Sequence, residues 1–136
     1  MSGLAMRQPE RLSQYFKRKL GQKWSRPTTY HGIEFRSYLE SRFAFHLDQM
    51  DEEWIYEPRR YGDYLPDFEV VSASRPTFIE VKPTRAEVEG AQERMEVIWR
   101  YVPDALLIVA CGEDCLFFSC QPDGQWLEWQ DRWRNE

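Results

Sequence analysis

The stretch YLPDFEVVSASRPTFIEVK, residues 64–82, decides the fold. It holds two segments rich in β-branched and aromatic residues, Leu65–Val71 and Thr77–Lys82, on either side of a short loop that contains serine and proline. Side chains two residues apart on a strand project from the same face, so Glu80 and Lys82 point the same way. The stretch therefore predicts two neighbouring strands with charged groups on one face.

The remainder of the chain predicts helices around further strands. Apolar residues recur at steps of three and four from Ile33 to Met50, a spacing typical of an amphipathic helix, and a second helix-prone segment runs from Arg85 to about Tyr101. Gly21 to Thr29 is expected to be a loop. The other expected strands are Trp54–Tyr61, Leu106–Cys111 and Cys115–Cys120, while Trp126–Trp133 fits a strand or a helix. This order predicts an α/β fold with a mixed central sheet flanked by helices.

Length and composition limit the classes of protein that this chain can represent. A chain of 136 residues suits one domain with a single core. No apolar run approaches the roughly 20 residues that a membrane helix needs, and no signal peptide is evident, so we expect a cytoplasmic protein without a membrane partner. Three cysteines fall within ten residues and include no Cys-x-x-Cys pair, which argues against zinc.

The charge is distributed unevenly along the chain. The net charge is −5, but residues 1–30 carry +6 and the remaining residues carry −11. We therefore expect a basic N-terminal extension, residues 1–29, in which residues 9–20 could form a short helix, followed by an acidic main domain, residues 30–136. A basic arm attracts a phosphate backbone, although a solubilising tail or an arm docked on the body would fit as well. The candidate DNA-binding residues of the arm are Lys17, Arg18, Lys19 and Lys23.

Three charged residues of the opening stretch form a candidate catalytic group. If its two strands pair as a hairpin, Asp67 lies beside Glu80 and Lys82. Two carboxylates suit a hard cation such as Mg²⁺, to which the Val81 backbone carbonyl would also lie close. A cation so held activates water against a phosphodiester, and Lys82 would position that water or stabilise the developing charge. The alternative is a solvated strand face with a cross-strand ion pair.

Other charged residues extend the candidate site. Glu40 borders the apolar stripe of the first predicted helix, where a carboxylate often has a partner, and a metal centre would be one. Arg36 stands four residues earlier, so a simple salt bridge is the alternative role for Glu40. Arg59 and Arg60 stand near the predicted hairpin tip, where they could contact backbone phosphate or belong to a solvated turn.

Four segments together resemble a known family. They are Phe35–Ala44, Tyr56–Pro58, Tyr64–Phe68 and Phe78–Pro83, and they look like the PD-(D/E)xK nuclease superfamily. The likeness is greatest to phage-encoded members and to transposon-end-cleaving endonuclease subunits, and it covers about residues 30–111. The Glu-Val-Lys and Tyr-x-Pro-Asp-Phe segments are its specific parts.

The resemblance implies a restriction-endonuclease-like αβββαβ core, dependence on Mg²⁺ or Mn²⁺, and DNA cleavage that leaves a 5′-phosphate. Residues 112–136 match no part of the family, but we expect residues 30–136 to form one nuclease domain. Carried over residue by residue, the resemblance assigns Glu40, Asp67 and Glu80 to the metal site and Lys82 as the catalytic lysine. It also places Arg36 and Ser37 near phosphate, and Gln92 and Arg94 on a helix that faces the site.

The sequence thus predicts a metal-dependent deoxyribonuclease, with endonucleolytic cutting favoured. One alternative is a resolvase of Holliday junctions or other branched DNA, which would work as a homodimer. Another is a nuclease-like subunit that binds DNA or protein without cleaving. A third is a structural subunit of a phage or transposon assembly, for which an acidic body would suit protein partners.

Overall fold

A computed structural model describes residues 24–130 and 133 of the chain. The chain divides into two compact units, residues 1–41 and 42–136, and each is described by itself. The boundary predicted at residue 30 falls inside the first unit. The predicted basic helix and the arm residues Lys17, Arg18, Lys19 and Lys23 lie outside the described residues.

The described part of the first unit opens with a short hairpin. Strands β1 (Thr28–Tyr30) and β2 (Ile33–Phe35) pair antiparallel around the two-residue turn His31-Gly32. Both turn residues have positive φ, 50° and 77°, as the tightest hairpin turns require. The predictions of a helix from Ile33 and of a loop up to Thr29 are therefore wrong where the two strands form. The turn at Gly32 reverses the chain before a helix can begin.

The helix expected from Ile33 to Met50, α3 (Tyr38–Gln49), begins only after this hairpin. Ser37 caps it, because the Ser37 Oγ accepts the backbone N–H of Glu40 at 3.1 Å and donates to Glu40 Oε1 at 3.1 Å. A serine and a glutamate three residues apart are a recurrent signal for a helix start. This cap fixes the beginning of the helix at Tyr38, five residues later than the periodicity suggested.

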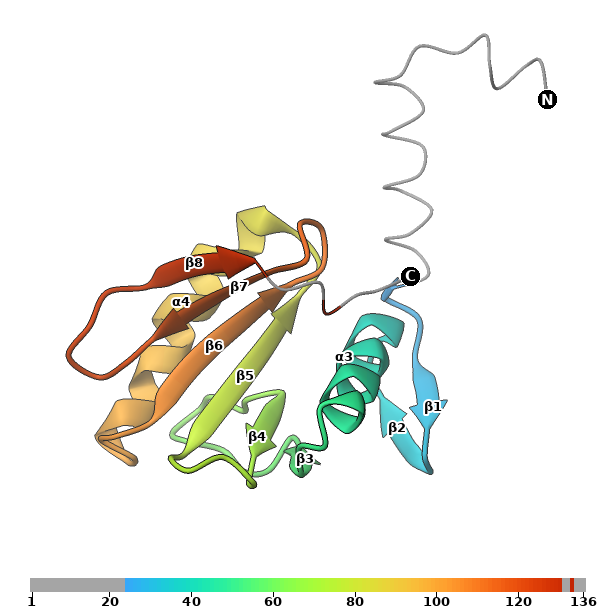
Figure 1. Cartoon of the computed structure of the whole chain (residues 1–136), viewed down its shortest axis with the longest axis horizontal. Helices are drawn as coiled ribbons and strands as arrows, with labels where there is room; N and C mark the ends of the chain where they lie inside the picture. The colour runs from blue at the N-terminus through green and yellow to red at the C-terminus, as the bar shows by residue number, and fades with distance from the viewer. Residues whose placement is uncertain (1–23, 131–132, 134–136) are drawn as a thin grey trace, which may run out of the picture. The chain divides into compact units, whose positions relative to one another are not determined.

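The second unit contains a six-stranded mixed sheet in the order β3-β4-β5-β6-β7-β8 (Figure 1). Only β5 and β6 are parallel, and every other neighbouring pair is antiparallel. The prediction of a mixed α/β fold is confirmed at this level. The strands are β3 (Trp54–Tyr56), β4 (Phe68–Val70), β5 (Thr77–Lys82), β6 (Leu106–Cys111), β7 (Leu116–Cys120) and β8 (Leu127–Gln130).

A helical crossover joins the two parallel strands, as a parallel pair requires. It consists of η1 (Arg85–Glu87), α4 (Val88–Met95) and η2 (Glu96–Arg100) and lies behind the sheet in Figure 1. Its apolar side chains pack on one face of the sheet. The buried cluster includes Val88, Ala91, Met95 and Ile98 from the crossover, Phe78, Leu107, Val109, Cys111, Leu116 and Phe118 from β5, β6 and β7, and Tyr61, Tyr64 and Ala105 from the loops.

Aromatic side chains form the layer on the opposite face of the sheet. Strand residues alternate between faces, so Phe68 and Phe117 point away from the α4 side. Within the second unit the Phe43 ring lies 5.5 Å from that of Phe68, 5.9 Å from that of Phe117 and 5.1 Å from that of Trp133. The sheet therefore has an apolar layer on both faces, between which its central strands are buried.

Several strands are shorter than the sequence suggested. Strand β3 stops at Tyr56 rather than Tyr61, because Glu57 takes a left-handed conformation with φ 48° before Pro58. Strand β4 begins at Phe68 rather than Leu65, because Pro66 has no N–H for a ladder bond. Cys115, with φ 52°, belongs to the turn before β7, and residues 127–130 of the ambiguous C-terminal segment form β8.

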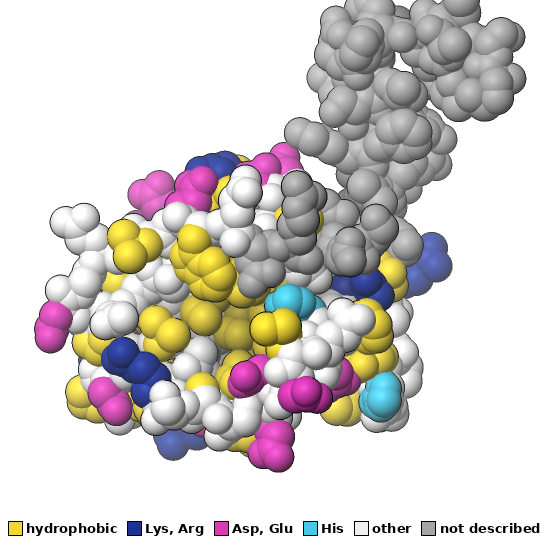
Figure 2. All heavy atoms as spheres, viewed as in Figure 1, with side chains coloured by type: hydrophobic (Ala, Val, Ile, Leu, Met, Phe, Trp, Pro, Cys, Tyr) yellow, Lys and Arg dark blue, Asp and Glu magenta, His cyan; other side chains and the backbone are white. Residues whose placement is uncertain are grey.

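In the view of Figure 2, apolar side chains lie open on part of the face of β6–β8 that points away from α4. Leu127 is 64% and Trp129 41% exposed there.

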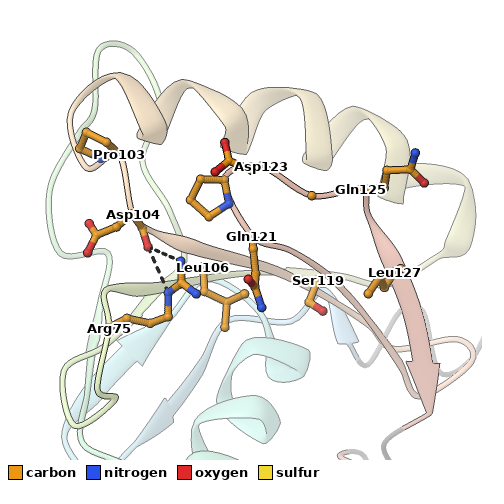
Figure 3. A pocket seen from close by; sticks show the side chains of 11 residues that line it. Arg75, Pro103, Asp104, Leu106, Ser119, Gln121, Asp123, Gln125 and Leu127 are labelled. Atoms are coloured by element: carbon orange, nitrogen blue, oxygen red, sulfur yellow. Dashed lines mark hydrogen bonds between the residues drawn. The ribbon is translucent and has the colours of Figure 1, made fainter.

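A hollow of about 800 Å³ lies between the loop before β6 and the β7–β8 loop (Figure 3). In it the Arg75 side chain donates two hydrogen bonds to the Asp104 carbonyl. No helix of the described residues is long and apolar enough to cross a membrane.

Candidate active site

The pairing of β4 with β5 determines where the two strand carboxylates lie. Phe68 pairs with Ile79, so one further step of the same register sets Asp67 opposite Glu80. Both carboxylates are buried, with exposures of 9% and 6%. Opposite residues of an antiparallel pair have Cβ atoms about 4.5–5.5 Å apart, so the two acids share one spot on the sheet.

Asp67 is held by hydrogen bonds to both neighbouring segments. Its Oδ2 accepts the Val81 backbone N–H at 2.8 Å, and its backbone carbonyl accepts the Glu57 N–H at 2.7 Å. A buried carboxylate is costly unless such donors compensate for the lost water. The bond to Val81 fixes the side chain against β5, so Asp67 has a defined direction as well as a defined place.

The backbone N–H and C=O groups of Val81 point toward the chain segment that carries Asp67. Within one strand residue the N–H and C=O point to the same neighbouring strand, and the N–H of Val81 reaches Asp67. By the β4–β5 register Val81 stands opposite Pro66, which has no N–H to offer. The ladder thus supplies no donor from that position to the Val81 carbonyl, whose oxygen suits the metal-ligand role predicted for it.

Glu80 is held between two donors. Its Oε1 accepts the Tyr64 hydroxyl at 2.5 Å, and its Oε2 lies 3.5 Å from Lys82 Nζ. Burial raises the pKa of Glu80, while the Tyr64 hydrogen bond and the positive charges of Lys82 and Arg94 act in the lowering direction. The structure therefore brings Glu80 and Lys82 together on one face and adds a third side chain to them.

Tyr64 is the residue that the sequence reasoning missed. It is buried, at 8% exposure, and its pKa is raised above 10.0 by burial first and by the nearby Glu80 charge second. Tyr64 belongs to the Tyr-x-Pro-Asp-Phe segment of the family resemblance, which assigns no role to the tyrosine. The available signal was an aromatic residue with a hydroxyl group three positions before the candidate ligand Asp67. Its hydrogen-bond partner, Glu80, lies sixteen residues further along the chain.

Arg94 lies close enough to this group to influence it. It projects from α4 with an exposed side chain, and its positive charge partly opposes the rise that burial causes in the pKa of Glu80 and of Tyr64. Gln92 lies half-buried on the same helix. Of the two helix residues that the resemblance assigns to the side facing the site, Arg94 is thus the one whose charge acts on Glu80 and Tyr64.

Glu40, Ser37 and Arg36 belong to the first unit. Glu40 is buried and takes part in the cap with Ser37 described above, so both have a structural role at the start of α3. Arg36 precedes the cap and therefore lies outside the helix.

Arg59 and Arg60 lie on the segment that leads into the site. The Arg59 guanidinium stacks 4.7 Å above the Tyr61 ring, and Arg60 donates to the Asp63 carbonyl at 3.1 Å. Both side chains are exposed. These contacts hold two positive charges beside the turn that carries Tyr64.

The donor set fits a hard divalent cation better than a soft one. No three His, Cys, Asp or Glu side chains among the described residues gather as a ready-made metal site. Mg²⁺ commonly uses one or two carboxylates together with waters and substrate oxygens, so the pair Asp67 and Glu80 is a sufficient protein contribution. Each carboxylate oxygen has two lone pairs, so the hydrogen bonds described leave capacity for a cation.

The hollow of Figure 3 is not at these carboxylates. Its lining includes Arg75, Asp104, Leu106, Ser119 and Gln121, and none of the residues predicted for the site. Arg75 precedes β5, whereas Lys82 ends that strand, so the hollow and the acidic group lie at opposite ends of β5.

No protein-family model matches the chain, and no curated protein or solved structure matches it significantly. The likeness to PD-(D/E)xK nucleases therefore rests on the residues of this chain alone.

Proposed function

We propose that the chain is a metal-dependent deoxyribonuclease that hydrolyses DNA phosphodiester bonds, with endonucleolytic cutting favoured. The observation that carries the proposal is the pair of buried carboxylates, Asp67 and Glu80, on adjacent strands beside the Lys82 ammonium. Burying two acids together is costly unless cations compensate. The order α3, β3, β4, β5, α4, β6 also supports a restriction-endonuclease-like αβββαβ core as part of the proposal.

Each residue of the group has a distinct task in this proposal. Asp67, Glu80 and the Val81 carbonyl hold Mg²⁺ or Mn²⁺. When bound, the cation would acidify a water and offset charge on the phosphate. Lys82 orients that water or stabilises negative charge on the phosphate, a task for which its half-buried position beside Glu80 is suitable.

The substrate contacts are assigned by charge. Arg59 and Arg60 are exposed and held beside the Tyr64 turn, where a phosphate backbone would pass the carboxylates. Glu40 is proposed as a third acid of the metal site, and Arg36, Ser37 and the arm residues Lys17, Arg18, Lys19 and Lys23 as further DNA contacts. Homodimerisation, or a phage or transposon partner, remains part of the proposal.

A cleavage assay tests the function. Supercoiled, linear, single-stranded and four-way-junction DNA are each incubated with the chain and Mg²⁺ or Mn²⁺, beside Lys82→Ala. Arg100→Ala is the matched control, because Arg100 is an exposed cation at the end of η2, away from the carboxyl end of β5. We expect metal-dependent cleavage that falls about 10²- to 10³-fold in Lys82→Ala and is unchanged in Arg100→Ala.

The outcomes separate the alternatives. Cleavage confined to the four-way junction, by a dimer, would identify a resolvase. No cleavage of any DNA, together with a melting temperature indifferent to Mg²⁺ and Mn²⁺, would replace the proposal with a non-catalytic binding or structural subunit. Equal cleavage by wild type and Lys82→Ala would remove the lysine from the mechanism.

A further inference from the structure

The hydroxyl of Tyr64 is a buried polar group that the proposed reaction does not use. Tyr64 lies at the edge of the apolar cluster between the sheet and α4, where phenylalanine would fill the same space without a polar atom. A buried hydroxyl is costly unless it is paired. Here it is paired with one atom of the site, Glu80 Oε1.

A tight turn fixes where that hydroxyl points. Tyr61 and Tyr64 form an isolated antiparallel bridge, with backbone hydrogen bonds of 2.7 Å and 3.1 Å between them. Gly62, at φ 63°, allows the reversal, and Arg60 donates to the Asp63 carbonyl inside the same turn. The hydrogen-bonded backbone of this short turn therefore fixes the direction of the Tyr64 ring, which points toward Glu80.

The two tyrosines of this turn do different things. The Tyr61 ring packs 5.3 Å from Phe78 and 5.8 Å from Tyr101, with the Arg59 guanidinium over it. Tyr64 contacts the carboxylate instead. Of the two tyrosines at the ends of this turn, Tyr61 thus has a packing role and Tyr64 a polar one.

We propose that Tyr64 is a positioning residue of the metal site: its hydroxyl holds Glu80 Oε1, so that Glu80 is oriented toward the cation that it shares with Asp67. This inference rests on the proposed function. With Lys82 Nζ beside Oε2, the carboxylate is fixed at both oxygens and cannot rotate into the apolar cluster. Partners that orient a ligand strengthen metal binding without touching the metal.

The test measures the binding of Mn²⁺ alone, by calorimetry and by the metal-induced rise in melting temperature. The variants are Tyr64→Phe, Glu80→Gln and the double variant, and Tyr61→Phe is the matched control in the same turn. We expect Tyr64→Phe to weaken Mn²⁺ binding about 10- to 100-fold, and Tyr61→Phe to leave it unchanged. In the Glu80→Gln background, removing the Tyr64 hydroxyl should have no further effect on the affinity.

A second measurement needs no change at Tyr64. Mg²⁺ added to the wild-type chain should perturb the near-ultraviolet absorbance of a buried tyrosine, and Glu80→Gln should lack that signal. The inference is overturned if wild type binds Mn²⁺ and folded Tyr64→Phe binds it equally well. It is also overturned if Mg²⁺ binds without a tyrosine signal. Failure of wild type itself to bind either metal would instead count against the proposed function.

Discussion

The side chain of Asp67 takes the place of a strand neighbour for Val81, because its Oδ2 accepts the Val81 backbone N–H at 2.8 Å. One carboxylate thereby completes the hydrogen bonding of β5 and, in the proposed function, provides a metal ligand. The two roles can be separated, because the first needs only an acceptor atom and the second needs a charge.

Asp67→Asn should keep the fold and lose the metal. The amide oxygen of asparagine can still accept the Val81 N–H, whereas Asp67→Ala leaves that buried donor without its acceptor. We expect Asp67→Ala to lower the free energy of unfolding by about 1–3 kcal/mol and Asp67→Asn by clearly less. Both should abolish the stabilisation by Mn²⁺. Chemical denaturation with and without Mn²⁺ measures this, and equal destabilisation by the two variants would contradict the bridging role.

Glu80→Gln should change how stability depends on pH. Burial raises the pKa of Glu80 above 4.5, so the folded chain binds this proton more tightly than the unfolded chain does. The contribution of Glu80 to stability is then greatest below about pH 4.5 and is lost as the pH rises through the raised folded value. The free energy of unfolding of Glu80→Gln, relative to wild type, should therefore increase over that range. Urea titrations at several pH values measure it, and a difference that is flat in pH would refute the shift.

The cap of α3 allows the role of Glu40 to be tested apart from its structural role. Ser37→Ala removes the acceptor for the Glu40 N–H and should cost about 0.5–2 kcal/mol of stability. Glu40→Gln keeps a side chain that can complete the cap, so it should be nearly as stable as wild type. If Glu40 belongs to the metal site, Glu40→Gln should nevertheless lose cleavage. A fully active Glu40→Gln would restrict Glu40 to the cap.

Arg59 and Arg60 should contribute to DNA affinity through phosphate contacts. Replacing either by alanine should weaken binding to all sequences alike and should reduce the slope of log affinity against log salt by about one. Fluorescence anisotropy with Ca²⁺ in place of Mg²⁺ measures binding at several salt concentrations. Arg100→Ala is the control, and an unchanged salt slope in both Arg59→Ala and Arg60→Ala would exclude these contacts.

The three cysteines should differ sharply in reactivity. Cys111 and Cys120 are buried and burial raises the pKa of both thiols, whereas Cys115 is partly exposed. Only thiolates react with disulfide reagents, so we expect one fast thiol per native chain and three in denaturant. Cys115→Ser should eliminate the fast phase. Rapid labelling that persists in Cys115→Ser would show that the β6–β7 region opens readily.

The strands at the centre of the sheet were predictable because their signals are local. Thr77–Lys82 alternates and ends at a proline, and Leu106–Cys111 is an apolar run ended by glycine; both were predicted with the observed bounds. The β1–β2 hairpin was not predicted, because residues before Ser37 continue the helical spacing by coincidence. In that segment the turn at Gly32 and the cap at Ser37 outweigh periodicity.

The candidate site was predictable to the extent that it depends on one strand pair. The hairpin of β4 and β5 alone sets Asp67 beside Glu80, and two-residue spacing brings Lys82 to the same face. Tyr64 could not be found this way, because its direction depends on the bridge between Tyr61 and Tyr64, which has no strand pattern. The catalytic roles themselves stay predictions.

Pro66 ends the β4 ladder early, and this changes the hydrogen bonding at the end of β5. Strand β5 continues for three residues past its last β4 pair, and over these residues its backbone ladder is with β6. Those residues are Glu80, Val81 and Lys82. Between two interior strands the sheet thus has a carbonyl, that of Val81, to which the facing residue offers no ladder hydrogen bond. One proline therefore creates, in the middle of a sheet, the kind of main-chain oxygen without a ladder partner that is otherwise found at a sheet edge.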